Sequence, residues 1–191
     1  MARHLGIAVL SLLGLLVLSN SVTAQQPTIL YVNRTDPTCG GHSPCFTTIQ
    51  AAINAAGPGN LIHIQAGTYT EQLAITDKNN FSGATEVDRI VIEADPAAAP
   101  GSVVLTGSPG PQCTDKFAIR IKQTKFVTVR GLTITGTGGQ AISMMGGNNG
   151  NVGIHIELNR IFGNGSSSCD GGITVNRGNP GTLIVDRKSV V

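Results

Sequence analysis

Short apolar runs separated by Gly, Asn and Pro occupy most of the chain beyond Asn60. Runs of this length that are rich in β-branched residues and end in turn residues are typical of strands. The ranges predicted as strands are Ile29 to Val32, Leu61 to Ile64, Leu73 to Ile75, Ile90 to Ile92, Val103 to Leu105, Ala118 to Ile121, Val127 to Ile134, Ala141 to Met144, Ile154 to Ile161, Gly172 to Val175 and Leu183 to Val185. The pattern therefore predicts an all-β chain, with its asparagines serving turns at Asn148, Asn149, Asn164 and Asn179.

One segment has helical rather than strand spacing. Four apolar residues fall on one helical face: Ile49, Ala52, Ile53 and Ala56. Thr47 and Gln50 have the spacing of a capping box, and the following Gly57-Pro58-Gly59 ends the helix. The apolar face needs a partner, and the open end of a stack of strands would provide one.

The later strands repeat along the chain. Val127 to Gly136 aligns with Ile154 to Gly163 at an offset of 27 residues, and a third copy begins at Leu183. A fixed offset in this range indicates a solenoid, in which each coil buries its apolar residues against its neighbours. A β-sandwich is the alternative for a chain of many short strands, but it does not predict the repeat.

The segment from Phe46 to Glu71, with the sequence FTTIQAAINAAGPGNLIHIQAGTYTE, resembles the opening of pectate-lyase-like right-handed β-helix proteins. The likeness continues through Arg89 to Ala94 and Val127 to Ile134, and it covers roughly residues 29 to 185. The resemblance implies a right-handed parallel β-helix, an amino-terminal capping α-helix, and a Gly-Thr-Tyr turn after the first strand. It does not fix the function, because lyases, hydrolases, epimerases and non-catalytic surface proteins share this opening.

The amino terminus is predicted to be a cleaved signal peptide over residues 1–24. Arg3 and His4 precede the apolar run from Leu5 to Leu18, and small residues at Val22 to Ala24 suit a signal peptidase. A membrane anchor is the alternative, but the run is shorter than the ~20 residues that span a bilayer. We therefore expect a secreted protein, extracellular or at the cell surface, without a membrane span in the mature chain.

The carboxyl-terminal residues are predicted to lie outside the β-helix domain, which is placed at residues 25–185. The third copy of the repeat is lost by Val191 without a polar cap, so the chain is interpreted as an amino-terminal fragment. Residues 186–191 are interpreted as read-through of a short-read sequencing adapter, the alternative being a natural carboxyl terminus. An oligomer is expected only if the open end is natural.

The balance of basic and acidic residues bears on one class of partner, nucleic acid. Without residues 1–24 and 186–191, the chain has 10 basic and 10 acidic residues. This balance argues against nucleic acid as the main partner.

Four cysteines in an exported chain favour disulfides. Cys39 and Cys45 flank a short loop and are predicted to pair, with a metal site that includes His42 as the alternative. Cys113 and Cys169 lie in corresponding loops two coils apart, at about 10 Å from strand to strand, so their pairing requires the loops to bend toward each other.

Strand alternation predicts a basic stripe on one outer surface. With Ile119 and Ile121 inward, Arg120 and Lys122 point outward, and Ser143 and Thr174 occupy the matching positions on later coils. The candidate substrate-binding residues are Lys116, Arg120, Lys122 and, farther round the coil, Arg130. Such a stripe suits a uronate or sulfated polysaccharide, whose charges repeat along the chain, although a solvated face without a ligand is the plainer interpretation.

The resemblance also implies a possible catalytic site. Related lyases hold calcium with carboxylates and use Lys or Arg to remove the proton beside a uronate carboxylate. The candidate calcium ligands are Asp115, Asp170 and Glu157, with Arg120 or Lys122 as the base. No spacing in this sequence matches a complete signature of the family.

Two functions follow from these patterns. The favoured one is a secreted or cell-surface β-helix scaffold that binds glycans or other surfaces without catalysis. The alternative is the amino-terminal part of a calcium-dependent polysaccharide lyase acting on uronate polysaccharide.

Overall fold

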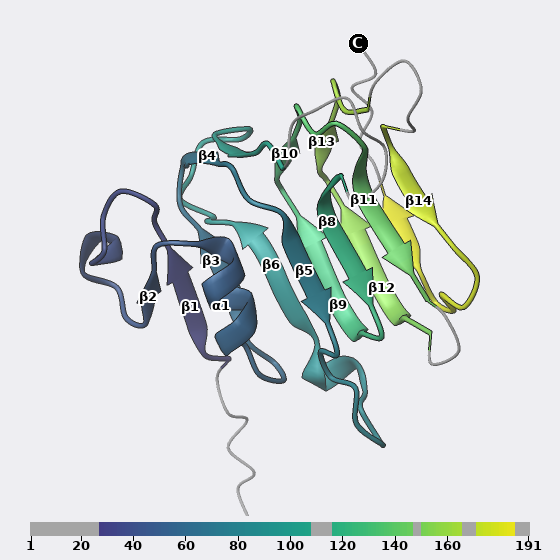
Figure 1. The fold of residues 1–191 in the computed structure, drawn as a ribbon. Coiled ribbons are helices and arrows are strands. Elements are labelled where there is room, and N and C mark those ends of the chain that lie inside the picture. Colours follow the sequence, from purple (N-terminus) through teal and green to yellow (C-terminus); the bar gives the residue numbers. More distant parts are fainter. Residues whose placement is uncertain (1–26, 108–115, 147–149, 166–170, 186–191) are drawn as a thin grey trace, which may run out of the picture.

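A computed structural model describes residues 27–107, 116–146, 150–165 and 171–185. The predicted all-β architecture with parallel strands is confirmed, because the strands form three sheets in which every pairing is parallel (Figure 1). In spatial order, sheet A contains β15 (Leu183–Val185), β12 (Val152–Glu157), β9 (Lys125–Arg130), β6 (Ile90–Ala94), β3 (Leu61–Ile64), β1 (Ile29–Val32) and β2 (Cys45–Phe46).

Sheets B and C complete the coils. Sheet B contains β13 (Arg160–Ile161), β10 (Thr133–Ile134), β7 (Val103–Leu105) and β4 (Gly67–Tyr69). Sheet C contains β14 (Ile173–Val175), β11 (Gln140–Met145), β8 (Phe117–Lys122) and β5 (Leu73–Thr76). From β3 to β15 the chain visits the sheets in a fixed cyclic order, A, B, C, so each three strands make one coil.

The 27-residue offset of the sequence repeat equals the offset between paired strand residues in successive coils. Val127 pairs with Ile154 and Ile134 pairs with Ile161, both at an offset of 27 residues. The third copy is also confirmed, because β15 pairs with β12 through Ile184 and Ile156. The two longest predicted strands are each divided in two, since a turn at Gly131-Leu132 separates β9 from β10 and a turn at Leu158-Asn159 separates β12 from β13.

The core consists of inward side chains stacked from coil to coil. In sheet A the stack has five members, each at most 5% exposed: Leu30, Ile62, Ile92, Val129 and Ile156. Burying one such aliphatic side chain stabilises the fold by about 1.5–3 kcal/mol.

Along the described part of the chain, no helix has the length and apolar content required to cross a membrane.

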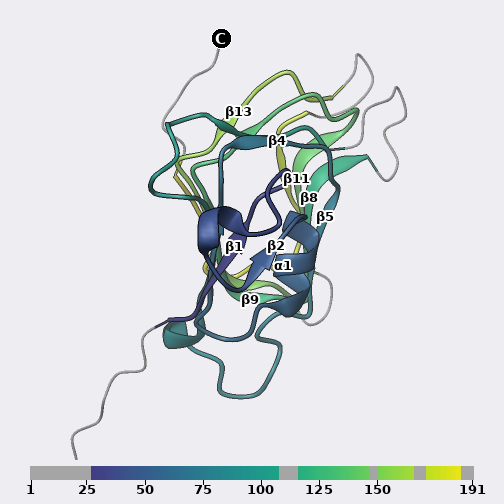
Figure 2. The same cartoon turned by 90° about the vertical axis from the view of Figure 1, so that its left-hand side faces the viewer.

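Helix α1 (Ile49–Ala55) buries the predicted apolar face, since Ile49, Ala52, Ile53 and Ala56 all belong to the core. Figure 2 views the molecule with α1 and β1 in front of the later coils.

The predicted capping box was wrong. The helix begins one residue later, with Thr48 as N-cap accepting from the amide of Ala51, while the Glu71 carboxylate accepts from the amides of Ile49 and Gln50 at 3.0 Å each. The side-chain acceptor for these first amides of the helix is thus Glu71, 22 positions after Ile49 in sequence.

Glu71→Gln should lower the free energy of unfolding by about 1 kcal/mol, because a neutral amide oxygen is a weaker acceptor at a helix amino terminus than a carboxylate. Urea unfolding measures the change. Asp77→Asn is the control, since the exposed Asp77 side chain accepts only a long 3.3 Å bond from Asn80. An effect of Asp77→Asn as large as that of Glu71→Gln would contradict the capping role.

The carboxyl end of α1 is held by Lys78, whose Nζ donates to the carbonyls of Asn54 (3.1 Å) and Ala56 (2.9 Å). Burial lowers the pKa of the Lys78 ammonium below its ordinary value. The folded state therefore binds this proton less tightly than the unfolded chain does. As a result, Lys78 makes the free energy of unfolding rise with pH between the lowered pKa and 10.5.

Replacing Lys78 by Met should remove this contribution. The difference in unfolding free energy between the wild type and Lys78→Met is expected to grow in favour of the wild type as the pH rises toward 10.5. Urea titrations of both proteins across this range measure it. A difference that shrinks with pH would contradict the assignment.

Three asparagines hold the turns of one coil to the coil before it by the same two bonds. Each side-chain oxygen accepts from the amide 27 residues earlier, and each side-chain nitrogen donates to the carbonyl 30 residues earlier. The sets are Asn151 with Thr124 and Ile121, Asn159 with Leu132 and Val129, and Asn164 with Thr137 and Ile134. The predicted turn roles of Asn164 and Asn179 are confirmed, Asn179 accepting from Asn151 at 2.6 Å. Asn148 and Asn149 lie outside the described residues.

Near the amino terminus, the predicted disulfide between Cys39 and Cys45 is confirmed. Its loop is ordered by Asp36, whose carboxylate accepts from Thr38 and from the amide of Gly40. These hydrogen bonds, first those from Thr38, lower the pKa of Asp36.

The expected Gly-Thr-Tyr turn was wrong, because Gly67–Tyr69 forms β4 and pairs with β7.

Candidate functional site

The outer face of sheet C has the residues predicted for the basic stripe. Arg120 and Lys122 lie on β8, and the residues that alternate with them, Ile119 and Ile121, are fully buried. The predicted register is confirmed: Arg120 pairs with Ser143, and Ser143 pairs with Thr174. On the preceding coil the opposite residues are Ala74 and Thr76. On the following coil Lys122 lies opposite Met145, so neutral side chains flank both cations along the solenoid axis.

Arg120 is held against the surface by an aromatic ring. Its guanidinium carbon lies 3.9 Å from the centre of the Phe117 ring, a distance typical of a cation–π contact. Lys122 is exposed and lies two residues after Arg120 on β8. Lys116 directly precedes the first residue of β8. The four strands of sheet C contain Arg120 and Lys122 but no acidic residue. This face can therefore hold an anionic group at a guanidinium and at an ammonium on the same strand.

Arg130 is in a different electrostatic setting on sheet A. Its Nε donates to Glu93 at 2.6 Å, and His63 Nε2 lies 3.1 Å from the other oxygen of the same carboxylate. Glu93 is nearly buried, with a side chain 9% exposed. The positive charge of Arg130 is thus matched by a neighbouring carboxylate, which makes Arg130 a weak candidate for binding an anion.

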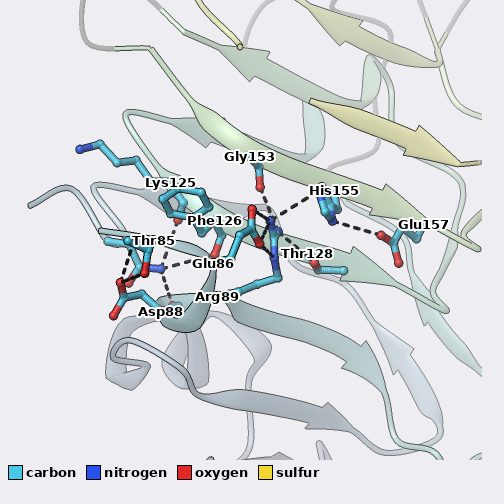
Figure 3. A network of polar contacts seen from close by, with 11 residues as sticks. Thr85, Glu86, Asp88, Arg89, Lys125, Phe126, Thr128, Gly153, His155 and Glu157 are labelled. Atoms are coloured by element: carbon cyan, nitrogen blue, oxygen red, sulfur yellow. Dashed lines mark hydrogen bonds and ion pairs between the residues drawn. The ribbon is translucent and has the colours of Figure 1, made fainter. Parts of the chain in front are cut away.

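Sheet A also carries a network centred on Arg89 that the sequence did not reveal (Figure 3). The Arg89 guanidinium forms two bonds of 2.8 Å to Glu86, within the 3₁₀ turn Glu86–Asp88, and donates to Thr128 Oγ1 at 3.2 Å. It also donates to the carbonyl of Gly153 at 2.9 Å. One side chain, 14% exposed, therefore joins the segment before β6 to β9 and β12.

The candidate ligand Glu157 lies at the far side of this network. Its carboxylate is 3.2 Å from His155 Nδ1, and His155 Nε2 lies 3.4 Å from Arg89 (Figure 3). Glu157 is on β12 in register with Arg130, whereas Arg120 and Lys122 are on β8 in sheet C. The structure thus places Glu157 on a different sheet from the two candidate bases.

The other candidates for calcium and for the second disulfide lie outside the described residues: Asp115, Asp170, Cys113 and Cys169. Among the residues that the structure describes, no group of three or more His, Cys, Asp and Glu side chains is arranged to hold a metal ion.

A groove of about 460 Å³ lies at the corner between sheets A and B. Its walls are mainly apolar, from Ala94, Pro96 and Leu158, and its polar groups include Asp95 and Arg160. The Arg160 guanidinium carbon lies 4.5 Å from the centre of the Phe162 ring. One acidic and one basic side chain share this groove, so it lacks the single sign of charge found on the strands of sheet C.

The fold and this face define a predominantly β protein of stacked parallel coils with a cationic outer sheet. Comparison with known proteins adds no relative, since no protein-family model, curated protein or solved structure matches the chain.

Proposed function

We propose that the chain is an exported, right-handed β-helix scaffold of the pectate-lyase-like type, with α1 as its amino-terminal cap, whose sheet C face binds acidic polysaccharide without catalysis. The observation that carries the proposal is the outward projection of Arg120 and Lys122 from four strands that contain no acidic residue. An acidic polysaccharide has repeated carboxylates or sulfates, and a face of one charge sign attracts such a chain. The disulfide Cys39–Cys45 supports export, because disulfides persist in oxidising compartments.

Calcium-dependent lyase activity is the competing function. It requires carboxylates close to Arg120 or Lys122, and the one described candidate, Glu157, is paired with His155 on sheet A. Binding therefore has more support in the described residues than catalysis has.

Incubation with a soluble polyuronate in the presence of calcium separates the two functions. The proposal predicts binding that weakens with Arg120→Ala and with added salt, without the appearance of unsaturated sugar products. Calcium-dependent unsaturated products that disappear in Asp170→Ala would instead establish the lyase. Absence of any binding would refute the role of the basic face.

A further inference from the structure

Three Asn-X-Ser/Thr tripeptides occur in the chain, and none of them belongs to the face on sheet C. They begin at Asn33, Asn80 and Asn164 and read Asn-Arg-Thr, Asn-Phe-Ser and Asn-Gly-Ser. This tripeptide is the acceptor sequence for N-linked glycosylation of exported proteins. The sugar is joined to the side-chain nitrogen of the asparagine, which has two hydrogens and loses one of them. The hydrogen bonds of each side chain therefore decide whether the folded protein can accommodate a glycan there.

At Asn164 the fold uses both side-chain N–H groups. Nδ2 donates to the carbonyl of Ile134 at 2.9 Å and to the carbonyl of Phe162 at 3.1 Å, while Oδ1 accepts from the amide of Thr137 at 3.2 Å. A sugar in place of one hydrogen would remove one of these two donors. Because the bond to Ile134 joins one coil to the coil before it, a glycan at Asn164 conflicts with the folded structure.

Asn33 is half-buried directly after β1, and its side chain is fixed at both ends. Nδ2 donates to Gln65 Oε1 at 2.6 Å, and Gln65 Nε2 donates in turn to the carbonyl of Cys39 at 3.1 Å. Oδ1 accepts from the amides of Thr35 and Asp36, at 2.9 Å each. A bulky substituent on Nδ2 would have to displace Gln65, so the fold also opposes a glycan at Asn33.

Asn80 differs from the other two asparagines in exposure and in bonding. Its side chain is exposed, as are those of Phe81 and Ser82. Nδ2 donates to the carboxylate of Asp77 at 3.3 Å, a long bond that needs one of the two hydrogens. The segment between β5 and β6, which contains this tripeptide, projects from the body of the coils (Figures 1 and 2). A glycan on Nδ2 thus leaves one hydrogen for the bond to Asp77 and displaces no buried group.

Exposed apolar surface on the same segment also favours a glycan. Phe81, the middle residue of the tripeptide, is 43% exposed, and Val87 is 84% exposed. An N-linked glycan is a bulky, hydrophilic group that increases solubility. Attached to Asn80, it would lie directly beside the Phe81 ring and reduce the contact of this apolar surface with other molecules.

We propose that Asn80 carries an N-linked glycan in the folded, exported protein, whereas Asn33 and Asn164 stay unmodified. This inference rests on the export that forms part of the proposed function, and it is independent of polysaccharide binding. The donor is an oligosaccharide linked to a lipid diphosphate, and a eukaryotic secretory pathway supplies both this donor and the transferase. The bond from sugar C1 to the diphosphate oxygen breaks and a bond from C1 to Asn80 Nδ2 forms. The diphosphate leaves with the electron pair, and one Nδ2 proton passes to a base of the transferase.

Expression in eukaryotic cells tests the proposal. The full chain is produced with its own amino terminus and, in parallel, with a signal peptide of the host in place of residues 1–24, so that entry into the pathway does not depend on the predicted signal. Release of N-glycans by an amidase converts each modified asparagine to aspartate, and mass spectrometry of the peptides locates it. We expect conversion at Asn80 and not at Asn33 or Asn164.

Three substitutions remove one acceptor sequence each and leave the asparagines in place: Thr35→Ala, Ser82→Ala and Ser166→Ala. Ser82→Ala should abolish the mobility shift that the amidase reverses, whereas Thr35→Ala and Ser166→Ala should keep it. Ser82→Thr, which keeps the hydroxyl, should be glycosylated like the wild type. Asn80→Gln should also abolish the shift and should be secreted normally, because the Asn80 side chain is exposed.

Two results would overturn the proposal. One is a shift that persists in Ser82→Ala and is lost in Thr35→Ala or Ser166→Ala. The other is the absence of a glycan from the secreted protein that has the host signal peptide. A glycan at Asn80 in that protein, together with retention of the chain that has its own amino terminus, would support the site and refute the predicted export.

Discussion

Arg89→Ala is expected to lower the free energy of unfolding by about 3 kcal/mol, because it removes charged hydrogen bonds at a nearly buried position. The substitution breaks the paired bonds to Glu86 and leaves the carbonyl of Gly153 and the hydroxyl of Thr128 without this donor. It also detaches the 3₁₀ turn Glu86–Asp88 from β9 and β12. Urea unfolding followed by circular dichroism measures the change.

Arg160→Ala is the matched control for Arg89→Ala. Arg160 is exposed and lies against Phe162, so its removal should cost less than about 1 kcal/mol. Equal effects of the two substitutions would show that the Arg89 bonds contribute nothing beyond an ordinary surface arginine. Glu86→Gln should have an intermediate effect, because the Glu86 side chain is 63% exposed and keeps most of its hydration.

Asn159→Ala is expected to have a comparable effect, also about 3 kcal/mol, for a different reason. Its side chain accepts from the amide of Leu132 at 3.0 Å and donates to the carbonyl of Val129 at 2.9 Å. Asn159 is 3% exposed, so water does not readily replace these bonds, and each buried main-chain group left without a partner costs about 1–3 kcal/mol. The midpoint of urea unfolding reports the loss.

A graded series tests this explanation. Asn164→Ala removes the equivalent bonds from a half-buried position and should cost less than Asn159→Ala. Asn80→Ala, in an exposed loop, should be close to neutral. A series in which Asn80→Ala is as destabilising as Asn159→Ala would contradict the assignment of stability to the turn asparagines.

Most of the fold is predictable because each coil repeats the one before it. Period-two alternation placed Ile119 and Ile121 inside and Arg120 and Lys122 outside, and the offset of 27 residues equals the register of β9 with β12. The turn asparagines follow the same offset, since Asn159 lies 27 residues after Leu132, whose amide it accepts from. A comparison of the two aligned segments could have indicated it, because an amide side chain replaces an apolar one at a turn.

The predictions that were wrong concern contacts between distant parts of the chain. Thr47 and Gln50 have the spacing of a capping box, but Thr48 is the N-cap and the distant Glu71 accepts from the amides of Ile49 and Gln50. Nothing local to the helix indicates the contact with Glu71. The turn at Gly67–Tyr69 was expected from the family resemblance, but these residues form β4, which pairs with β7. The Arg89 network was missed for the same reason, since Gly153 and His155 lie more than 60 residues from Arg89.

The candidate site was predictable in position but not in electrostatics. The stripe on β8 follows from alternation alone, whereas the pairing of Arg130 with Glu93 requires the register of β6 with β9. Glu157 likewise became a candidate ligand from its residue type, and the structure shows it beside His155 on another sheet.

Affinity for a soluble polyuronate at low salt, measured by isothermal titration calorimetry, tests the binding function most directly. The comparison includes the wild type and two double variants. The first combines Arg120→Gln with Lys122→Gln, and the second combines Arg34→Gln with Arg160→Gln. Both double variants lose two positive charges, but only the first alters the sheet C face. We expect at least about tenfold weaker binding for the first double variant and nearly unchanged binding for the second. Equal losses in the two would mean that only net charge matters, and would contradict a binding face on sheet C.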